Sequence, residues 1–357
     1  MSGPGRSPGP RPGSPAPLPP PPAGATHPRD DWEAGPQLTG DPAAVAGLLD
    51  PIFAVDTTPE LGRSLALVAV QGGRIVAERY GPSAGPDTPF ISWSTAKSFT
   101  HAALGVLALD GRFRPDEPFR TPEWGDDDPR AAITGTDLLR MRSGLRFVED
   151  YVDETTSDCL EMLWGSGADD VAGYAASLPL EHPVGSTFNY SSGTTNVLAR
   201  RLSEEFGPGP GGVGAFLAER LFEPLGMRSA APRYDAAGTW VGSSYLYATA
   251  RDFARFGLLY LRDGTWDGRR LLPEGWVDRA RTLRSVDPDD GWCYGEHWWV
   301  RDDDLGTFWA NGYEGQMIAV VPALDLVVVR IGKTSSELRP HLERFWQDLT
   351  ACFRDRP

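Results

Sequence analysis

The sequence predicts an α+β fold, in which an antiparallel sheet formed by the N- and C-terminal segments is flanked by helices and interrupted by a mainly helical insertion. Two β-prone runs, residues 65–71 and 74–80, surround Gly72-Gly73, a pattern typical of an antiparallel hairpin. Two apolar runs near the C-terminus, residues 316–321 and 326–331, predict a second hairpin. Hairpins at both ends of a chain with helices between them are typical of the α+β class.

Helices are predicted where apolar side chains recur at helical spacing. Asp41 is a candidate N-cap for a helix that follows it directly. Residues 95–110 and residues 336–353 each place their apolar side chains on one helical face. The insertion, about residues 114–240, is rich in Gly, Asp and Pro and contains several short helical patterns.

The charge balance excludes two classes of partner. The 357 residues carry 34 Lys and Arg against 49 Asp and Glu, a formal net charge of −15. A nucleic-acid-binding protein needs a basic face, and so does a protein that binds anionic membranes. Only Lys97 and Lys333 are lysines, and every other cationic side chain is arginine. Where a chain uses arginine at nearly every other cationic position, a lysine indicates a chemical role that arginine cannot fill.

Residues 1–40 are predicted to be a disordered, Pro-rich tail, and residues 41–357 to form one domain. Eleven of the first 28 residues are proline, which leaves too little apolar area to offset the entropy of ordering. The three cysteines are widely spaced, and no basic segment followed by an apolar one opens the chain. We therefore expect a cytoplasmic protein. The five histidines show no metal-ligand spacing, so no metal and no cofactor are expected.

Ser94 and Lys97 form the first candidate for chemistry. They stand at the start of the predicted helix over residues 95–110, three positions apart, and side chains at this spacing share a helical face. A serine hydroxyl becomes a good nucleophile when a neighbouring base takes its proton, and a lysine whose pKa is lowered by burial can be that base. An arginine cannot lose its proton near neutrality. The alternative is a capping serine beside a solvated lysine.

Tyr190 is the second candidate, in the triplet Tyr190-Ser191-Ser192. It is the only tyrosine in the chain with Ser or Asn two positions later. A phenol hydrogen-bonded to a lysine could pass a proton to a leaving group. The alternative is a core tyrosine at a turn.

With these motifs the sequence resembles the serine β-lactamase and penicillin-recognising superfamily, and most of all its class C-type esterases and 6-aminohexanoate-dimer hydrolases. The resemblance extends over about residues 50–350. Three further stretches carry it, residues 137–145, 249–259 and 308–316. It implies a β-lactamase-like fold and a serine hydrolase that works through an acyl-enzyme.

The resemblance also implies roles for individual residues. Ser94 would be acylated, Lys97 would be the general base and Tyr190 would relay protons. The backbone N–H groups of Ser94 and of Tyr313, on a strand expected over residues 311–315, would form the oxyanion hole. Further substrate contacts would come from four residues: Trp93, Ser192, Asn311 and Gly312.

One departure from the family pattern bears on the substrate. Relatives that act on penicillins or peptides usually carry a Lys or His on the third strand to receive the substrate carboxylate, whereas this strand reads Ala310-Asn-Gly-Tyr-Glu-Gly. Lys333 follows the last strand, one hairpin too late to replace that cation. We therefore expect a small amide or ester as the substrate. The alternatives are a β-lactamase or D-Ala-D-Ala carboxypeptidase, and a catalytically silent ligand receptor. The oligomeric state is not predicted.

Two other features have a structural and a functional interpretation. Ser83 lies in a Gly-x-Ser-x-Gly motif, but the prolines after it prevent the helix that a nucleophile elbow requires, so a plain loop is expected. Four tryptophans crowd the segment before the third strand: Trp292, Trp298, Trp299 and Trp309. They could be core residues or an aromatic wall over the acyl site.

Overall fold

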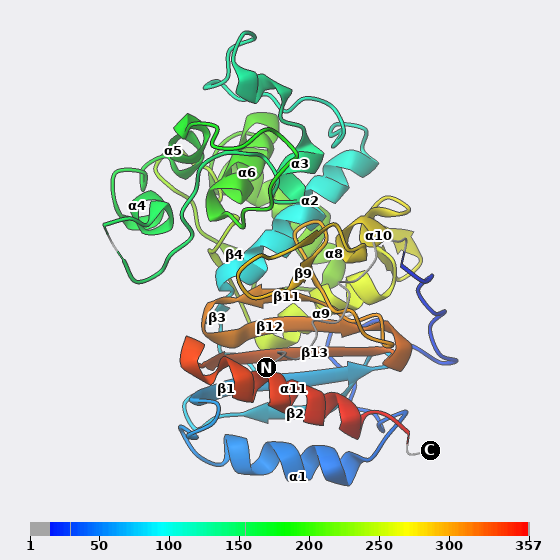
Figure 1. The fold of residues 1–357 in the computed structure, drawn as a ribbon. Helices are drawn as coiled ribbons and strands as arrows, with labels where there is room; N and C mark the ends of the chain where they lie inside the picture. The colour runs from blue at the N-terminus through cyan, green and yellow to red at the C-terminus, as the bar shows by residue number, and fades with distance from the viewer. Residues whose placement is uncertain (1–14, 29, 154, 356–357) are drawn as a thin grey trace, which may run out of the picture.

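The computed structural model describes residues 15–28, 30–153 and 155–355, and its central element is an antiparallel sheet of eight strands (Figure 1). The strand order is β2-β1-β13-β12-β11-β10-β9-β8, so the N-terminal and C-terminal hairpins pair side by side through β1 and β13. The predicted α+β class is confirmed. The strands are β1 Arg63–Gln71, β2 Arg74–Tyr80, β8 Ser285–Val286, β9 Cys293–Tyr294, β10 Trp299–Val300, β11 Phe308–Gly312, β12 Gln316–Val321 and β13 Leu326–Lys333.

Helices cover both faces of the sheet, which explains why the central strands are apolar on both sides. α1 (Pro42–Phe53) and α11 (Arg339–Cys352) pack on one face, against alternate residues of β1 such as Leu67. α9 (Ala250–Leu261) packs on the other face, against the intervening residues such as Val68. Asp41 caps α1 as predicted, because its carboxylate accepts hydrogen bonds from the first free backbone N–H groups of that helix.

The helix predicted over residues 95–110 is α2 (Ala96–Leu109), preceded by a 3-10 turn, Trp93–Thr95. It is buried on every side through Leu107 rather than on one face. Figure 1 shows the reason: α2 runs from the sheet into the helical region, so it has neighbours all round. Phe99 stacks on Phe256 of α9 with 3.6 Å between ring centroids. The nucleophile candidate therefore stands at the N-terminus of an almost fully buried helix.

The chain between α2 and α9 is mainly helical and gathers above the sheet in Figure 1. A small sheet of β3, β5 and β4 joins this region to the start of α2. The elements are β3 Phe90–Ile91, α3 Gly135–Leu139, α4 Asp158–Trp164, α5 Val171–Ser177, α6 Ser192–Phe206, α7 Ala215–Leu217, α8 Glu223–Leu225, β4 Ala231–Pro232 and β5 Leu246–Ala248. After α9 come β6 Thr265–Trp266, β7 Arg269–Arg270 and α10 Trp276–Arg281.

The Pro-rich segment differs from the expectation of a free tail over the part that the structure describes. Residues 15–28 contain neither helix nor strand, yet they lie along the domain. Arg281 Nη2 donates to the carbonyl of Ala16 (2.6 Å), and Arg255 Nη1 donates to that of Pro28 (2.8 Å). Proline-rich backbone has carbonyls but few N–H groups, so arginine side chains are suitable partners for it. The rest of the predicted tail, residues 1–14, lies outside the described residues.

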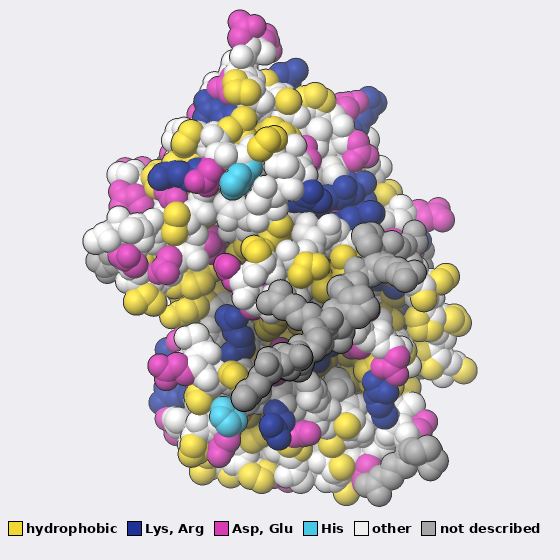
Figure 2. All heavy atoms as spheres, in the orientation of Figure 1, with side chains coloured by type: hydrophobic (Ala, Val, Ile, Leu, Met, Phe, Trp, Pro, Cys, Tyr) yellow, Lys and Arg dark blue, Asp and Glu magenta, His cyan; other side chains and the backbone are white. Residues whose placement is uncertain are grey.

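The viewed surface in Figure 2 interleaves arginines with carboxylates. Among the described residues many arginines pair with carboxylates, as Arg220 does with Asp110 at 2.8 Å. None of the helices formed by the described residues is long and apolar enough to cross a membrane.

Candidate active site

Ser94 stands in the middle of the 3-10 turn that leads into α2. The preceding residue, Trp93, has a φ of 45°, a left-handed conformation that is costly for a side chain of this size. Such strain persists only where the surrounding structure enforces it, and it is frequent beside reactive groups. The backbone N–H of Ser94 lies at the start of a helix, where N–H groups have no partner within the helix.

Lys97 lies one turn further on, with a side chain that is fully enclosed (1% exposed). Its Nζ donates three hydrogen bonds: to Ser94 Oγ (2.9 Å), to Ser192 Oγ (2.9 Å) and to the carbonyl of Ser243 (3.2 Å). Burial lowers the pKa of Lys97, and the nearby Glu149 carboxylate partly offsets that fall. An amine held in this way is a proton acceptor for Ser94 whenever it is neutral.

Tyr190 lies on the other side of Lys97. Lys97 Nζ is 4.9 Å from the centroid of the Tyr190 ring, which also stacks on Trp299 at 5.3 Å. Burial, together with the Glu149 charge, raises the pKa of Tyr190 well above its ordinary value, and a side-chain interaction with Ser94 works in the opposite direction. The phenol therefore keeps its proton in the resting site. The structure thus brings Ser94, Lys97 and Tyr190 together.

Glu149 is the site residue that sequence reasoning missed. Its carboxylate accepts hydrogen bonds from the backbone N–H and the hydroxyl of Ser192, both at 2.6 Å, and from the Tyr151 hydroxyl at 2.7 Å. Ser192 opens α6, so the carboxylate also faces the positive end of a helix dipole. The buried Ser192 hydroxyl donates to Glu149 and accepts from Lys97, and it links the two charged groups. No local pattern marks Glu149, because 43 residues separate it from Ser192.

The oxyanion candidate lies on a turn rather than on a strand. β11 ends at Gly312, and Tyr313–Gly315 form a 3-10 turn, so the strand expected over residues 311–315 is corrected to one that ends three residues earlier. The turn lies close to the nucleophile, since a Cβ on Gly312 would stand 2.8 Å from the carbonyl oxygen of Ser92. The Tyr313 ring meets the Trp93 ring edge-on at 5.9 Å.

A family model described as Beta-lactamase matches residues 59–352. The chain belongs to the Beta-lactamase family. The predicted resemblance is confirmed, and the protein is a serine hydrolase of this family.

Proteins similar to this Beta-lactamase-family chain include 6-aminohexanoate-dimer hydrolases and a penicillin-binding protein homologue. A 6-aminohexanoate-dimer hydrolase from Paenarthrobacter ureafaciens is 26% identical over 325 residues, which cover 82% of this chain and 80% of that protein. The putative 6-aminohexanoate-dimer hydrolase from Bacillus anthracis has a similar fold, with a TM-score of 0.71 at 22% identity over 92% of this chain and 88% of that one. A penicillin-binding protein homologue from Caulobacter crescentus has a TM-score of 0.65 at 19% identity, over 90% and 99%.

A row of aromatic rings lies beside the nucleophile turn, and it contains none of the four tryptophans predicted from the sequence. Trp93 packs against Tyr245 (6.4 Å between centroids) and Tyr313, and Tyr313 packs against Tyr151 (5.1 Å). Tyr313 is 44% exposed. The predicted cluster is mostly part of the core: Trp298, Trp299 and Trp309 are buried, and Trp292 packs against the latter two. Trp299 is the member that reaches the site, since it stacks on Tyr190.

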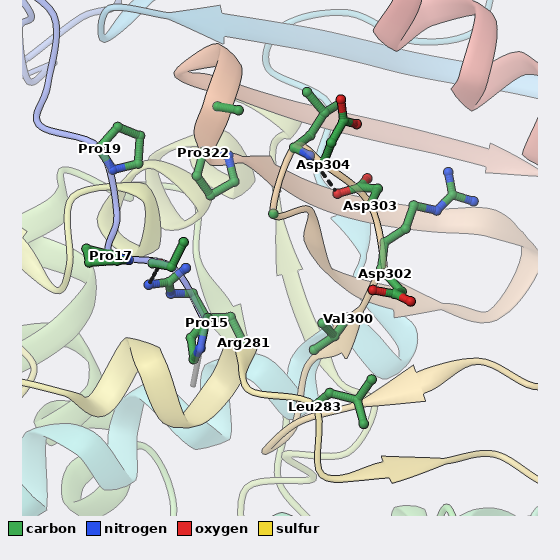
Figure 3. A pocket seen from close by; sticks show the side chains of 15 residues that line it. Pro15, Pro17, Pro19, Arg281, Leu283, Val300, Asp302, Asp303, Asp304 and Pro322 are labelled. Atoms are coloured by element: carbon green, nitrogen blue, oxygen red, sulfur yellow. Dashed lines mark hydrogen bonds between the residues drawn. The ribbon is translucent and has the colours of Figure 1, made fainter. Parts of the chain in front are cut away.

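Other sequence features lie apart from this site in the Beta-lactamase-family fold. Lys333 ends β13 as an exposed residue opposite Arg63. A cavity of about 500 Å³ opens between the proline segment and the loop of Asp302, Asp303 and Asp304 (Figure 3), and none of the candidate catalytic residues lines it. Among the described residues, no group of three or more His, Cys, Asp and Glu side chains could hold a metal ion.

Proposed function

We propose that the protein hydrolyses a small linear amide or ester through an acyl-enzyme formed on Ser94. The observation that carries this proposal is the buried Lys97 Nζ at 2.9 Å from Ser94 Oγ. The lowered pKa of Lys97 favours the neutral amine, which can accept the serine proton. Arginine at this position would keep its proton at any working pH.

In acylation, Ser94 Oγ attacks the substrate carbonyl carbon while its proton passes to Lys97 Nζ. The carbonyl oxygen becomes an oxyanion, which the backbone N–H groups of Ser94 and Tyr313 stabilise. The bond to the leaving nitrogen or oxygen then breaks as the Tyr190 hydroxyl donates its proton to that atom. Tyr190 regains a proton from the Lys97 ammonium, so the products are an acyl-Ser94 ester and a neutral amine or alcohol.

Deacylation reverses these proton transfers. Lys97 accepts a proton from water as the water oxygen attacks the acyl carbon, and Ser94 recovers its proton as the carboxylic acid leaves. Trp93 lies in the nucleophile turn and Gly312 packs against it, and in this proposal both residues contact the substrate together with Asn311. Ser192 acts beside them by holding Lys97, since its hydroxyl bonds to that amine and to Glu149.

The linear substrate class is supported by the relative named 6-aminohexanoate-dimer hydrolase and by the residues that follow β11. The strand on which penicillin-processing relatives place a cation begins its motif at Ala310 here, and the Tyr313–Gly315 turn after it packs a tyrosine ring against Trp93, beside the nucleophile. A substrate carboxylate adjoining the scissile bond would meet no counter-charge in that turn. The cytoplasmic location predicted from the sequence is part of this proposal, and cell fractionation tests it.

The experiment compares purified wild type with Ser94→Ala and, as the matched control, Ser83→Ala, which removes the other serine set in a nucleophile-like motif. Each protein is assayed with short 4-nitrophenyl esters, linear aminohexanoate dimer and nitrocefin, and labelled with a fluorophosphonate. We expect ester or amide turnover and labelling in wild type and Ser83→Ala, and neither in Ser94→Ala. Nitrocefin as the best substrate would replace this proposal with a β-lactamase. An unlabelled, inactive wild type would replace it with a ligand receptor.

A further inference from the structure

Arg330 is a buried arginine without a carboxylate partner. It lies on β13, is 1% exposed, and among the described residues its hydrogen-bond partners are carbonyl and hydroxyl oxygens, with no carboxylate among them. Burial lowers the pKa of Arg330 to about 10, and its Nε has no hydrogen-bond partner in the described structure. Burying a guanidinium without an opposite charge beside it lowers the stability of the fold, because the group loses its hydration and no carboxylate compensates for that loss. A buried arginine that lowers stability in this way is expected to have a specific role.

The guanidinium is bound by neutral oxygens from two places. Arg330 Nη1 donates to the carbonyls of Gly315 (3.0 Å) and Glu314 (3.3 Å). Arg330 Nη2 donates to Thr334 Oγ1 (2.6 Å) and to the carbonyl of Leu61 (3.3 Å). The guanidinium therefore connects the turn after β11 to the segment that leads into β1 through hydrogen bonds.

The turn that it ties down has an unfavourable backbone. Glu314 (φ 60°) and Gly315 (φ 77°) are consecutive left-handed residues, and Glu314 has a Cβ that disfavours this conformation. Two glycines make room for the guanidinium: a Cβ on Gly315 would stand 2.7 Å from Arg330 Nη1, and one on Gly332 would stand 2.5 Å from Nη2. The guanidinium therefore fits against the left-handed turn because glycine stands at both close positions.

We propose that Arg330 is a positioning residue for the oxyanion hole. By holding the carbonyls of Glu314 and Gly315 it fixes the turn that begins at Tyr313, and so it fixes the direction of the Tyr313 N–H. The inference rests on the proposed function, in which that N–H stabilises the oxyanion. In this proposal Arg330 contacts neither the substrate nor Ser94, so it affects only the stabilisation of the oxyanion in the transition state.

The test compares Arg330→Met, which keeps the bulk of the side chain and removes its donors, with Arg330→Lys, which restores a charged donor. The matched control is Arg255→Met. Arg255 is also buried and also donates to backbone carbonyls, those of Pro28 and Leu225, away from the site. The kinetic constants are measured with a 4-nitrophenyl ester and with its thiono analogue, in which sulfur replaces the carbonyl oxygen. Sulfur accepts hydrogen bonds weakly, so an oxyanion hole favours the oxygen ester.

We expect Arg330→Met to lower kcat for the oxygen ester about 10-fold to 100-fold, somewhat less than the loss of a whole oxyanion donor, with KM nearly unchanged. The preference for the oxygen ester is the ratio of kcat for the oxygen ester to kcat for the thiono ester. This ratio should fall in Arg330→Met, recover in part in Arg330→Lys, and stay at the wild-type value in Arg255→Met. A folded Arg330→Met with the wild-type kcat and preference would overturn the inference. So would an equal change in Arg255→Met, because it would mean general destabilisation.

Thr334→Val decides the matter if neither Arg330 variant folds, since it removes one anchor of the guanidinium and leaves the arginine in place. A narrowed preference supports the inference, and an unchanged preference overturns it. Ser94→Ala, assayed beside these variants, distinguishes a failure of the proposed function from a failure of the role assigned to Arg330. If Ser94→Ala retains turnover, the proposed function has failed; if Ser94 is needed and the preference does not move, only the role of Arg330 has failed.

Discussion

The Glu149 carboxylate accepts two hydrogen bonds of 2.6 Å from Ser192, one from its backbone N–H and one from its hydroxyl. The same hydroxyl accepts a hydrogen bond from Lys97 Nζ. Glu149 therefore affects Lys97, the proposed base, in two opposed ways: it orients the amine through Ser192, and its negative charge favours the protonated form, which cannot accept a proton.

Removing the Glu149 charge should move the pH profile in a defined direction. The carboxylate raises the pKa of Lys97, so Glu149→Gln should lower that pKa and make the neutral amine available at lower pH. We expect the acidic limb of the kcat/KM profile to shift to lower pH, and the maximal rate to fall because Lys97 is held less firmly. Glu161→Gln, at an exposed carboxylate, is the control. An acidic limb that stays in place or moves to higher pH would contradict the assignment of Lys97 as the base.

The two lysines provide a matched pair of substitutions. Lys97→Arg keeps a positive charge but cannot accept a proton, so kcat should fall by about 10²–10⁴-fold, the usual contribution of a general base. Lys333→Arg, at the exposed end of β13, should leave kcat and KM unchanged. Steady-state kinetics of both variants with one ester check this. Comparable activities in the two variants would show that the charge of Lys97, rather than its proton transfer, is what matters.

Replacing Tyr190 by Phe should affect substrates according to their leaving group. The ring still stacks on Trp299, so the site keeps its shape, but no hydroxyl remains to donate a proton. An amide needs that proton far more than an ester of 4-nitrophenol does, so we expect a loss of about 10²-fold or more for the amide and a smaller loss for the ester. Tyr294→Phe, a buried neighbour of the Tyr190 ring, serves as the control. Equal losses for amide and ester would argue against proton donation by Tyr190.

The packing behind the nucleophile helix can be tested through stability. Phe256 is fully buried and stacks on Phe99 of α2. Phe256→Ala should lower the free energy of unfolding by about 3–5 kcal/mol, since it removes a large apolar side chain and leaves a cavity. Urea unfolding followed by circular dichroism measures the change. A loss below about 1 kcal/mol would mean that α9 does not support α2 in the way described.

The sequence was sufficient for those parts of the structure that depend on neighbouring residues. Short β-prone and apolar runs predicted both hairpins, and the three-residue spacing predicted that Lys97 reaches Ser94, because helical geometry fixes that contact. The fold class also followed, since hairpins at both ends of the chain leave few ways to cover a sheet.

Contacts between distant segments could not be predicted in this way. Glu149 reaches Ser192 across 43 residues, and Arg330 lies under a turn that the sequence pattern extends as a strand. The position of the proline segment depends on arginines more than 200 residues away, which donate to its carbonyls. No local periodicity carries such information, because it arises only when the sheet and the insertion come together.

The most direct test of the central claim is to look for the acyl group itself. Wild type is mixed with 4-nitrophenyl acetate, quenched in acid before the first turnover is complete, digested and analysed by mass spectrometry. The account predicts one acetyl group on the peptide that contains Ser94, and none on that peptide in Ser94→Ala. An acetyl group on another residue such as Ser83, or turnover of the ester with no acetylated peptide at any quench time, would contradict it.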